Sequence, residues 1–282
     1  MAVVLGLLTA VAYGAADFFG GLSSRRSSVA AVVVCSQATS IVLLGLLVAV
    51  APGEPPLLRD VTYGAIAGVI GCAGLVLLYR GLAVGRMSVV APITAVGAAV
   101  LPVAWGLSQG ERPSAAALAG VGLALVAVVF VSRSPEGEAV VERAAGGRIE
   151  LVLALGAGCA FGVVFILLGS TSDDAGFWPL VGARPVSVVV LAVGALVMRQ
   201  ELRPRREDGP MVAITGVLDI SANALYLVAI RSGLLSLVAV LGSLYPAMTV
   251  VLARVVLHER LTRGQLLGLA LAAAGVALIA AG

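Results

Sequence analysis

Long apolar segments alternate with short polar segments along the whole chain. A helix needs about 20 mostly apolar residues to cross the hydrocarbon core of a bilayer, and the polar breaks leave ten segments of about this length. We expect membrane spans at residues 2–22, 29–51, 61–82, 88–108, 114–132, 149–170, 177–198, 210–230, 235–257 and 264–281. The pattern predicts an all-α integral membrane protein with ten transmembrane helices. Its many small residues, including GxxxG at Gly64–Gly68, predict a compact bundle.

Composition supports a membrane protein over a soluble one. The chain is 60% hydrophobic and 12% charged, whereas soluble domains average about 45–50% apolar and about 25% charged residues. The first apolar run has no basic segment before it and is longer than the core of a signal peptide, so we expect it to remain as a span. The three cysteines stand alone, without the spacing of a disulfide framework or a metal site. We expect no metal, no cofactor and no nucleic-acid partner.

The two halves of the chain repeat each other at an offset of 148 residues. Residues 85–128 align with residues 233–276 without a gap. The identical pairs include Gly85/Gly233, Ser88/Ser236, Glu111/Glu259, Arg112/Arg260 and Gly120/Gly268. Each copy holds five spans, so the second copy must cross the membrane in the opposite sense. The sequence therefore predicts two inverted five-helix repeats, an arrangement typical of secondary transporters.

The duplication divides the chain into two units. We expect the first unit at 1–132 and the second at 149–282, joined by a polar linker at 133–148. Arginines gather in the loops that follow odd-numbered spans. The positive-inside rule then places both termini outside the cell.

The only histidine lies in a polar stretch, HERLTRGQLLG at 258–268, that invites a catalytic or metal-binding interpretation. His258 aligns with Gly110 in the first copy, so the repeat does not require an imidazole. Thr262 and Gln265 have the spacing of a capping box at a helix start, and Ser114 is the matching N-cap candidate in the first copy. We therefore expect a turn between two helices at the membrane surface.

Asp17 is the most notable charge inside a span, with Tyr13 one turn before it on the same face. An ionisable group at bilayer depth costs at least about 2.5 kcal/mol and usually faces the bundle interior. A carboxylate that faces a cavity can bind a cation or carry a proton. Its counterpart in the second copy is Phe165, so the repeated architecture does not require the acid. The alternative is a carboxylate that caps or pairs with a neighbouring helix.

A second polar cluster lies in the eighth span. Asp219, Asn223 and Tyr226 are spaced i, i+4 and i+7, which puts them on one helical face. We expect this face to point into a cavity and contact a substrate. Arg184 is a candidate ion-pair partner of Asp219, and Gln37 belongs to a weaker polar face in the second span. The alternative is a purely structural ion pair.

Pro92 and Pro102 lie inside the fourth predicted span, and Pro246 lies inside the ninth. Proline removes a backbone hydrogen bond and kinks a helix. We expect kinks at these positions, which either shape a cavity and permit rocking or are static bends.

These residues resemble a known family. LLYRGLAVGRMSVVAPI (77–93) and SLYPAMTVVLARVVLHERLTRGQLLGLALAAAGVALI (243–279) are similar to the EamA repeat of the drug/metabolite transporter superfamily. The resemblance covers essentially the whole chain and implies export or import of small solutes such as amino acids, nucleotide sugars or drugs. The first copy departs from the pattern in one respect, because Pro92 and Pro102 flank the position that matches Pro246.

The leading hypothesis is a secondary transporter that moves a small organic solute across the cytoplasmic membrane by alternating access. Proton-coupled efflux through Asp17 is a further hypothesis. The competing hypotheses are a membrane-embedded enzyme and a structural membrane protein. We find no HExxH, no GxSxG and no ATP-binding GxxxxGK[ST] motif, so we expect no catalysis. The expected partners are the solute and the lipid bilayer, and the chain acts as a monomer or a homodimer.

Overall fold

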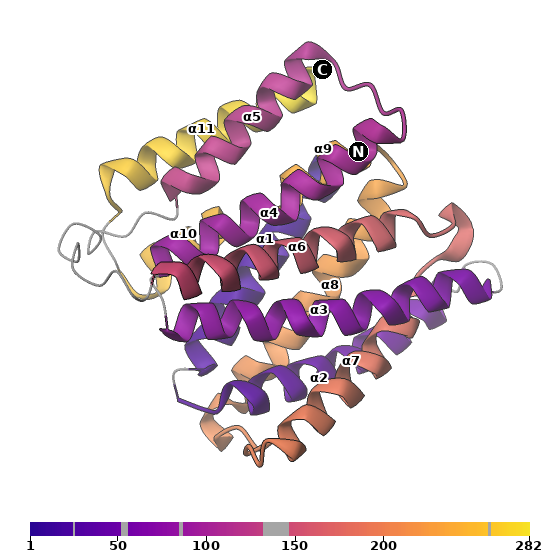
Figure 1. Ribbon diagram of the computed structural model, residues 1–282, viewed down its shortest axis with the longest axis vertical. Coiled ribbons are helices and arrows are strands. Elements are labelled where there is room, and N and C mark those ends of the chain that lie inside the picture. Colours follow the sequence, from indigo (N-terminus) through magenta and orange to yellow (C-terminus); the bar gives the residue numbers. More distant parts are fainter. Residues whose placement is uncertain (25, 52–55, 85–86, 132–146, 259–260) are drawn as a thin grey trace.

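The chain is a bundle of helices in the computed structural model (Figure 1). The structure describes residues 1–282 except 25, 52–55, 85–86, 132–146 and 259–260, and this part contains no strand. The α-helices are α1 (Ala2–Ser24), α2 (Val29–Val50), α3 (Leu58–Val84), α4 (Met87–Ser108), α5 (Ala115–Val131), α6 (Gly147–Gly169), α7 (Trp178–Val197), α8 (Gly209–Ile230), α9 (Leu235–Gly242), α10 (Tyr245–Val256) and α11 (Arg263–Ala281). Every predicted segment contains a helix. Most of the predicted linker lies outside the described residues, and α6 begins at its end.

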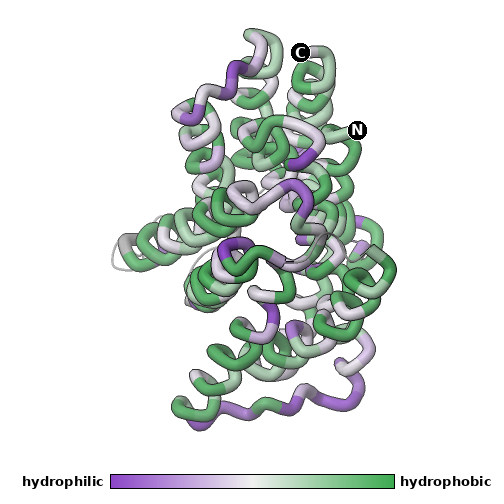
Figure 2. Tube along the Cα trace, turned by 90° about the vertical axis from the view of Figure 1, so that its right-hand side faces the viewer, coloured by the Kyte–Doolittle hydropathy of each residue, from purple (hydrophilic) through white to green (hydrophobic). Residues whose placement is uncertain are grey.

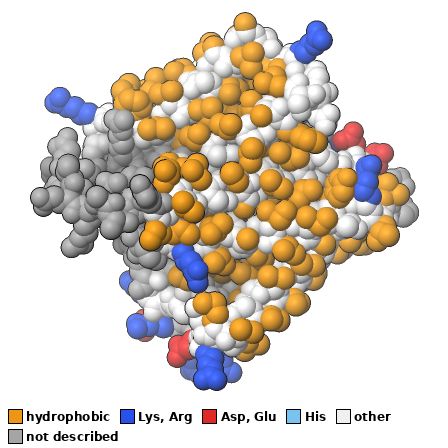
Figure 3. Space-filling view, viewed as in Figure 1, with side chains coloured by type: hydrophobic (Ala, Val, Ile, Leu, Met, Phe, Trp, Pro, Cys, Tyr) orange, Lys and Arg blue, Asp and Glu red, His pale blue; other side chains and the backbone are white. Residues whose placement is uncertain are grey.

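The exterior of the bundle is apolar. Among the described residues, eight helical stretches are long and apolar enough to cross a membrane, while Ile93–Ser108 of α4 and all of α5 are shorter apolar helices. Side chains such as Val42 and Val197 are each 77% exposed, and hydrophobic groups cover the face in Figure 3. Figure 2 shows hydrophilic residues mainly at the connections between helices. Exposed apolar surface of this extent requires lipid as solvent, so the chain is a multi-pass membrane protein.

The predicted ninth span consists of two helices rather than one kinked helix. Helix α9 ends at Gly242, and α10 begins at Tyr245 after a turn at Ser243 and Leu244. Pro246 lies in the first turn of α10, where its missing N–H costs nothing because that group has no helical partner. The expectation of a kink within one helix at Pro246 was therefore wrong in form, because the chain breaks the helix before the proline.

Other prolines lie within continuous helices. Helix α4 runs through both Pro92 and Pro102, and a kink at either residue stays a prediction. The structure adds Pro185, inside α7, which we did not single out. It falls on Gln37 of the first copy at the offset of the repeat.

Helices of one half pack mainly against helices of the other half, and the pairings are reciprocal. Helix α3 packs on α6 and α7, while its counterpart α8 packs on α1 and α2. Helix α4 packs on α6, and its counterparts α9 and α10 pack on α1. The last helices of the two halves, α5 and α11, lie side by side (Figure 1). Exchanging the two halves therefore returns the same main helix pairings.

Glycines at matching positions make the close approaches in this packing. A side chain on Gly14 of α1 would collide with Tyr245 of α10, and one on Gly162 of α6 would crowd Gly97 of α4. At the offset of 148 residues, Gly14 corresponds to Gly162 and Tyr245 corresponds to Gly97. The expected helix contacts at Gly120 and Gly268 are confirmed, because an added Cβ at either would lie within 3 Å of the facing helix. In lipid no hydrophobic effect drives helices together, so their association depends on close packing. Small residues permit that close packing.

Two buried aspartates, related by the same offset, tie the halves together at opposite ends of the bundle. Asp60 at the start of α3 is 0% exposed and accepts hydrogen bonds from the backbone N–H (3.0 Å) and hydroxyl (3.3 Å) of Ser172, before α7. Asp208 before α8 is 3% exposed and accepts a bond from the hydroxyl of Ser27 (2.7 Å), before α2. We did not single out either residue from the sequence. We refer to these two contacts as the aspartate clasps.

The polar stretch around His258 lies between the end of α10 and the start of α11, as expected. Thr262 accepts a hydrogen bond from the backbone N–H of Gln265 (3.1 Å), and the Gln265 side chain accepts one from the Thr262 N–H (2.9 Å), which completes the predicted capping box. His258 has φ 57° and its counterpart Gly110 has φ 95°. Both copies thus have a residue with left-handed backbone conformation at this position. Among non-glycine residues, histidine is enriched in that conformation. Glu259 and Arg260 lie outside the described residues.

The first copy has a well-defined counterpart of this turn. The hydroxyl of Ser114 accepts a bond from the backbone N–H of Ala117 (3.1 Å), which confirms the predicted N-cap. Glu111 accepts bonds from the backbone N–H groups of Leu235 (2.8 Å) and Ser236 (3.0 Å) at the start of α9. A carboxylate at a helix N-terminus satisfies free donors and complements the helix dipole. Glu111 therefore joins the end of α4 to the second half.

Candidate solute-binding site

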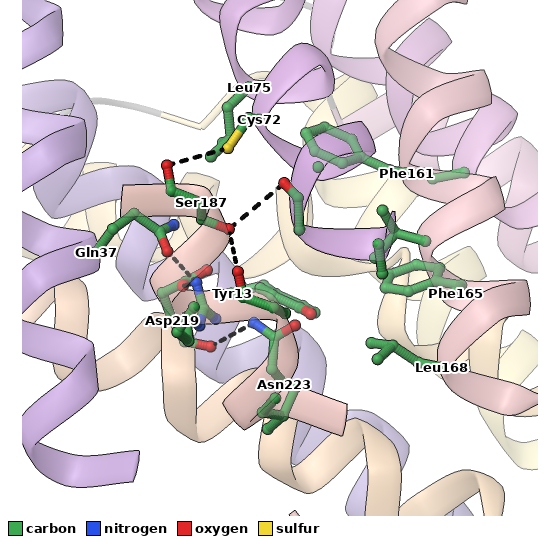
Figure 4. A pocket seen from close by; sticks show the side chains of 18 of the residues that line it. Tyr13, Gln37, Cys72, Leu75, Phe161, Phe165, Leu168, Ser187, Asp219 and Asn223 are labelled. Carbon is green, nitrogen blue, oxygen red and sulfur yellow. Dashed lines mark hydrogen bonds and ion pairs between the residues drawn. The ribbon is translucent and has the colours of Figure 1, made fainter. Parts of the chain in front are cut away.

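A pocket lies in the middle of the bundle between the two halves (Figure 4). Its walls come from α1, α2 and α3 of the first half and α6, α7, α8 and α10 of the second, with Ala98 of α4. The space amounts to about 920 Å³ when the part that is open to solvent is included, and about 120 Å³ of it can hold the centres of water-sized spheres.

Most residues that we predicted to contact a substrate meet at this pocket, although they come from four helices. Those that line it are Tyr13, Asp17, Gln37, Arg184, Asp219 and Asn223. Tyr226 is the exception and lies outside the set of lining residues. It is fully buried, its ring stacks on Phe165 with centroids 4.4 Å apart, and its hydroxyl donates to the Phe165 carbonyl oxygen at 3.4 Å. Its position supports the pocket wall from behind.

Arg184 is the centre of a polar cluster that joins three helices. Its residue is 6% exposed, and its Nη1 lies 2.7 Å from Oδ2 of Asp219. The same nitrogen donates a hydrogen bond to Oε1 of Gln37. The predicted pairing of Arg184 with Asp219 is confirmed, and it joins α7 to α8, with α2 added through Gln37. The Nε of Arg184 is buried and has no hydrogen-bond partner among the described residues.

Asp17 differs from Asp219 in having no partner among the described residues. Its residue is partly buried and borders the pocket, and no described residue donates a hydrogen bond to it or pairs with it. Tyr13 lies one turn before it, and the Tyr13 ring centroid is 6.3 Å from that of Phe165. The alternative that Asp17 caps or pairs with a neighbouring helix therefore finds no support in the part of the chain described. The site holds one paired and one unpaired carboxylate.

Asn223 keeps hydrogen-bonding capacity for a ligand. Its Nδ2 donates to the Asp219 carbonyl oxygen in its own helix at 2.8 Å. An amide side chain has a second N–H and a carbonyl oxygen in addition. Asn223 therefore anchors one group and presents others at the pocket.

Two polar residues of the pocket lining were not predicted from the sequence. Cys72 and Ser187 line the pocket, and the Cys72 thiol lies 3.5 Å from the Ser187 carbonyl oxygen. Neither residue is charged or part of a motif. The repeat does contain a signal for Cys72. At the offset of 148 residues, Asp219 corresponds to Gly71, and Cys72 is the next residue along the chain.

Aromatic residues were also missed. Phe161 and Phe165 of α6 and Tyr245 of α10 line the pocket together with aliphatic side chains of α3 and α6. We had considered Phe165 only as the counterpart of Asp17. Among the described residues, no three His, Cys, Asp or Glu side chains gather in a way that would hold a metal ion.

Comparison with known proteins agrees with this architecture. The model of the EamA-like transporter family matches residues 148–281. The second half of the chain therefore carries the sequence pattern of this family. Together with the apolar helices, the match supports a transmembrane transporter of the drug/metabolite transporter superfamily.

Two further similarities concern sequence and fold. An uncharacterized protein of Methanocaldococcus jannaschii is 27% identical over 133 residues, which is 47% of this chain and 97% of that protein. One solved crystal structure matches with a TM-score of 0.76 and 17% identity, covering 98% of this chain and 95% of that chain. The second likeness shows that the chain has a fold already observed by crystallography.

Proposed function

We propose that this chain is a secondary transporter that carries a small organic solute by alternating access, with ten spans arranged as two inverted repeats. The observation that supports this most is the pocket, which is walled by helices of both halves and combines an ion pair, an unpaired carboxylate and aromatic rings. Secondary transporters bind their substrate near the membrane midplane at the interface between repeats. The chain operates in the cytoplasmic membrane, and a monomer suffices because one chain supplies both repeats.

The reciprocal packing supports the inverted arrangement. Asp60 and Asp208 occupy matching positions at the starts of α3 and α8, yet these two helix starts lie at opposite ends of the bundle (Figure 1). An odd number of spans in each half accounts for this, because it reverses the second half in the membrane. The units 1–132 and 149–282 then rock against each other around the pocket. The Methanocaldococcus relative is barely longer than its matched segment, which supports a half of this size as a unit.

Within the pocket, Arg184, Asp219, Gln37 and Asn223 form the polar solute contacts, and Asp17 couples solute movement to protons. A carboxylate without an internal counter-charge can exchange a proton with either side when the pocket opens there. In liposomes with an imposed pH gradient, Asp17→Asn abolishes proton-driven solute accumulation. Retention of full proton-driven uptake by Asp17→Asn would reject this coupling role.

Alternating access has a test that does not depend on knowing the solute. Cys72 lines the pocket, and the only other cysteines are Cys35 and Cys159. In a Cys35→Ser/Cys159→Ser background, a membrane-impermeant maleimide should label Cys72 when it is added to either side of oriented vesicles. The matched control replaces Cys72 with Ser as well and should remain unlabelled. Labelling from only one side under all conditions would refute alternating access.

A further inference from the structure

The two halves contribute walls of different chemistry to the pocket, although they descend from one repeat. At the offset of 148 residues, Gly71 of α3 corresponds to Asp219 of α8, and Leu75 corresponds to Asn223. All four residues line the pocket. The α8 wall is therefore polar at the positions where the α3 wall is apolar.

The other symmetry-related pair of helices shows the same division. Tyr13 and Asp17 of α1 correspond to Phe161 and Phe165 of α6, and these four residues also line the pocket. Each of the four polar residues Tyr13, Asp17, Asp219 and Asn223 thus has an apolar counterpart in the pocket lining. Figure 4 shows Gln37 and Asp219 on one side and Phe161 and Phe165 on the other.

The polar wall can carry a net negative charge. Its ionisable groups are Asp17, Asp219 and Arg184, which together bear two negative charges and one positive charge when all three are ionised. The guanidinium of Arg184 is 2.7 Å from Asp219, and among the described residues it also donates a hydrogen bond to Gln37. One negative charge, that of Asp17, is therefore left for a ligand to neutralise.

A ligand must also satisfy the remaining donors and cover the apolar wall. The Arg184 residue is 6% exposed and its Nε lacks a partner, and a buried donor without a partner is costly. The rings of Phe161 and Phe165 offer flat apolar surface for an aromatic or bulky aliphatic group. A cation beside Asp17 also lies close to the Tyr13 ring, whose face attracts positive charge.

We propose that the pocket selects amphipathic solutes that carry one cationic nitrogen against the α1–α8 wall and an apolar, ring-sized group against the α3–α6 wall. This inference rests on the proposed transport function and assigns the class of solute to its site. Purely polar cations leave the α6 rings uncovered. Anions of the same shape leave Asp17 without a counter-charge and add a second uncompensated negative charge.

The test uses a matched set of small probes on the purified full-length protein in lipid nanodiscs. 2-Phenylethylamine carries both the cationic nitrogen and the ring. 2-Phenylethanol lacks the charge, ethylamine lacks the ring, and 3-phenylpropionate carries a negative charge instead of a positive one. Equilibrium binding is measured by calorimetry at pH 7. We expect 2-phenylethylamine to bind about tenfold more tightly than 2-phenylethanol or ethylamine, because charge-assisted contacts are about twice as strong as neutral ones, and 3-phenylpropionate to bind most weakly.

Variants separate the two walls. Asp17→Asn should reduce the advantage of the amine over the alcohol to less than about twofold while leaving alcohol binding unchanged. Asp174→Asn removes the same charge from an exposed loop and should leave every probe unaffected. Phe165→Leu should weaken the binding of 2-phenylethylamine and 2-phenylethanol equally without changing that of ethylamine. The helical circular dichroism of each variant verifies folding.

The outcomes distinguish this inference from the transport proposal. Equal binding of amine and alcohol, tighter binding of the anion, or no binding of any probe would overturn the solute class. If amines bind as expected but no solute crosses the membrane in reconstituted liposomes, the site stands and the transporter proposal falls. If liposomes accumulate an anion instead, the transporter stands and the solute class falls.

Discussion

The Arg184–Asp219 pair provides the sharpest test of how the pocket is held together. The two side chains are 7% and 26% exposed, respectively. Breaking a buried pair by removing one partner costs about 3–5 kcal/mol, whereas replacing both partners with apolar groups is far milder. Asp219→Leu leaves the buried guanidinium with only Gln37, so we expect a loss of about 3 kcal/mol in the free energy of unfolding.

Asp219→Leu is one variant of a double-mutant cycle, and the different exposure of the two side chains decides the losses expected for the other variants. Arg184→Leu leaves Asp219, which water in the pocket can partly hydrate, so we expect a smaller loss of about 2 kcal/mol. The double variant Arg184→Leu/Asp219→Leu removes both charges, and its loss of about 2 kcal/mol reflects mainly the unpaired Gln37 amide. The coupling energy between the two sites should therefore be about 3 kcal/mol.

The assay is reversible unfolding in mixed detergent micelles, followed by helical circular dichroism. Arg203→Leu, which removes an exposed loop charge, is the control and should change the free energy by no more than about 0.5 kcal/mol. Additive losses in the cycle, with a coupling energy below about 0.5 kcal/mol, would refute the pairing and with it the charge count of the pocket.

Three further predictions concern the frame around the pocket. Gly68→Leu should destabilise the bundle by at least about 2 kcal/mol, because an added Cβ would lie 2.5 Å from a carbonyl oxygen of α7; Gly45→Leu, with open space around it, is the control in the same unfolding assay, and equal stability of the two variants would contradict the packing. Asp60→Ala should cost about 1–3 kcal/mol by leaving the Ser172 N–H without its acceptor, and Asp60→Asn, which keeps an acceptor oxygen, should cost less; the clasp is unsupported if thermal unfolding ranks them the other way. Thr262→Ala should cost about 1 kcal/mol through loss of the capping box, measured as a lower midpoint, whereas Thr262→Ser should be nearly neutral.

The helices themselves were predictable from the sequence alone. The apolar segments are long, and in lipid every backbone group must be bonded within the segment, so hydrophobic length translates directly into a helix. The turn at His258 was predictable as well, because the repeat aligned it with a glycine and the capping box depends only on local spacing. The break before Pro246 was not, since a proline in a span is compatible with a kink or with a new helix start.

Which polar residues meet was only partly contained in the sequence. Asp17, Arg184 and Asp219 stood out because charges at bilayer depth are costly and must face the bundle interior. Their arrangement was decided by the tertiary structure: Arg184 reaches Asp219 and Gln37 and leaves Asp17 free, a choice that depends on how α1, α2, α7 and α8 cross. Helical periodicity put Tyr226 on the face of Asp219, yet the packing of Phe165 over its ring separates it from the pocket. Sequence fixes a residue's place on its own helix, whereas contacts between helices depend on distances that no single helix contains.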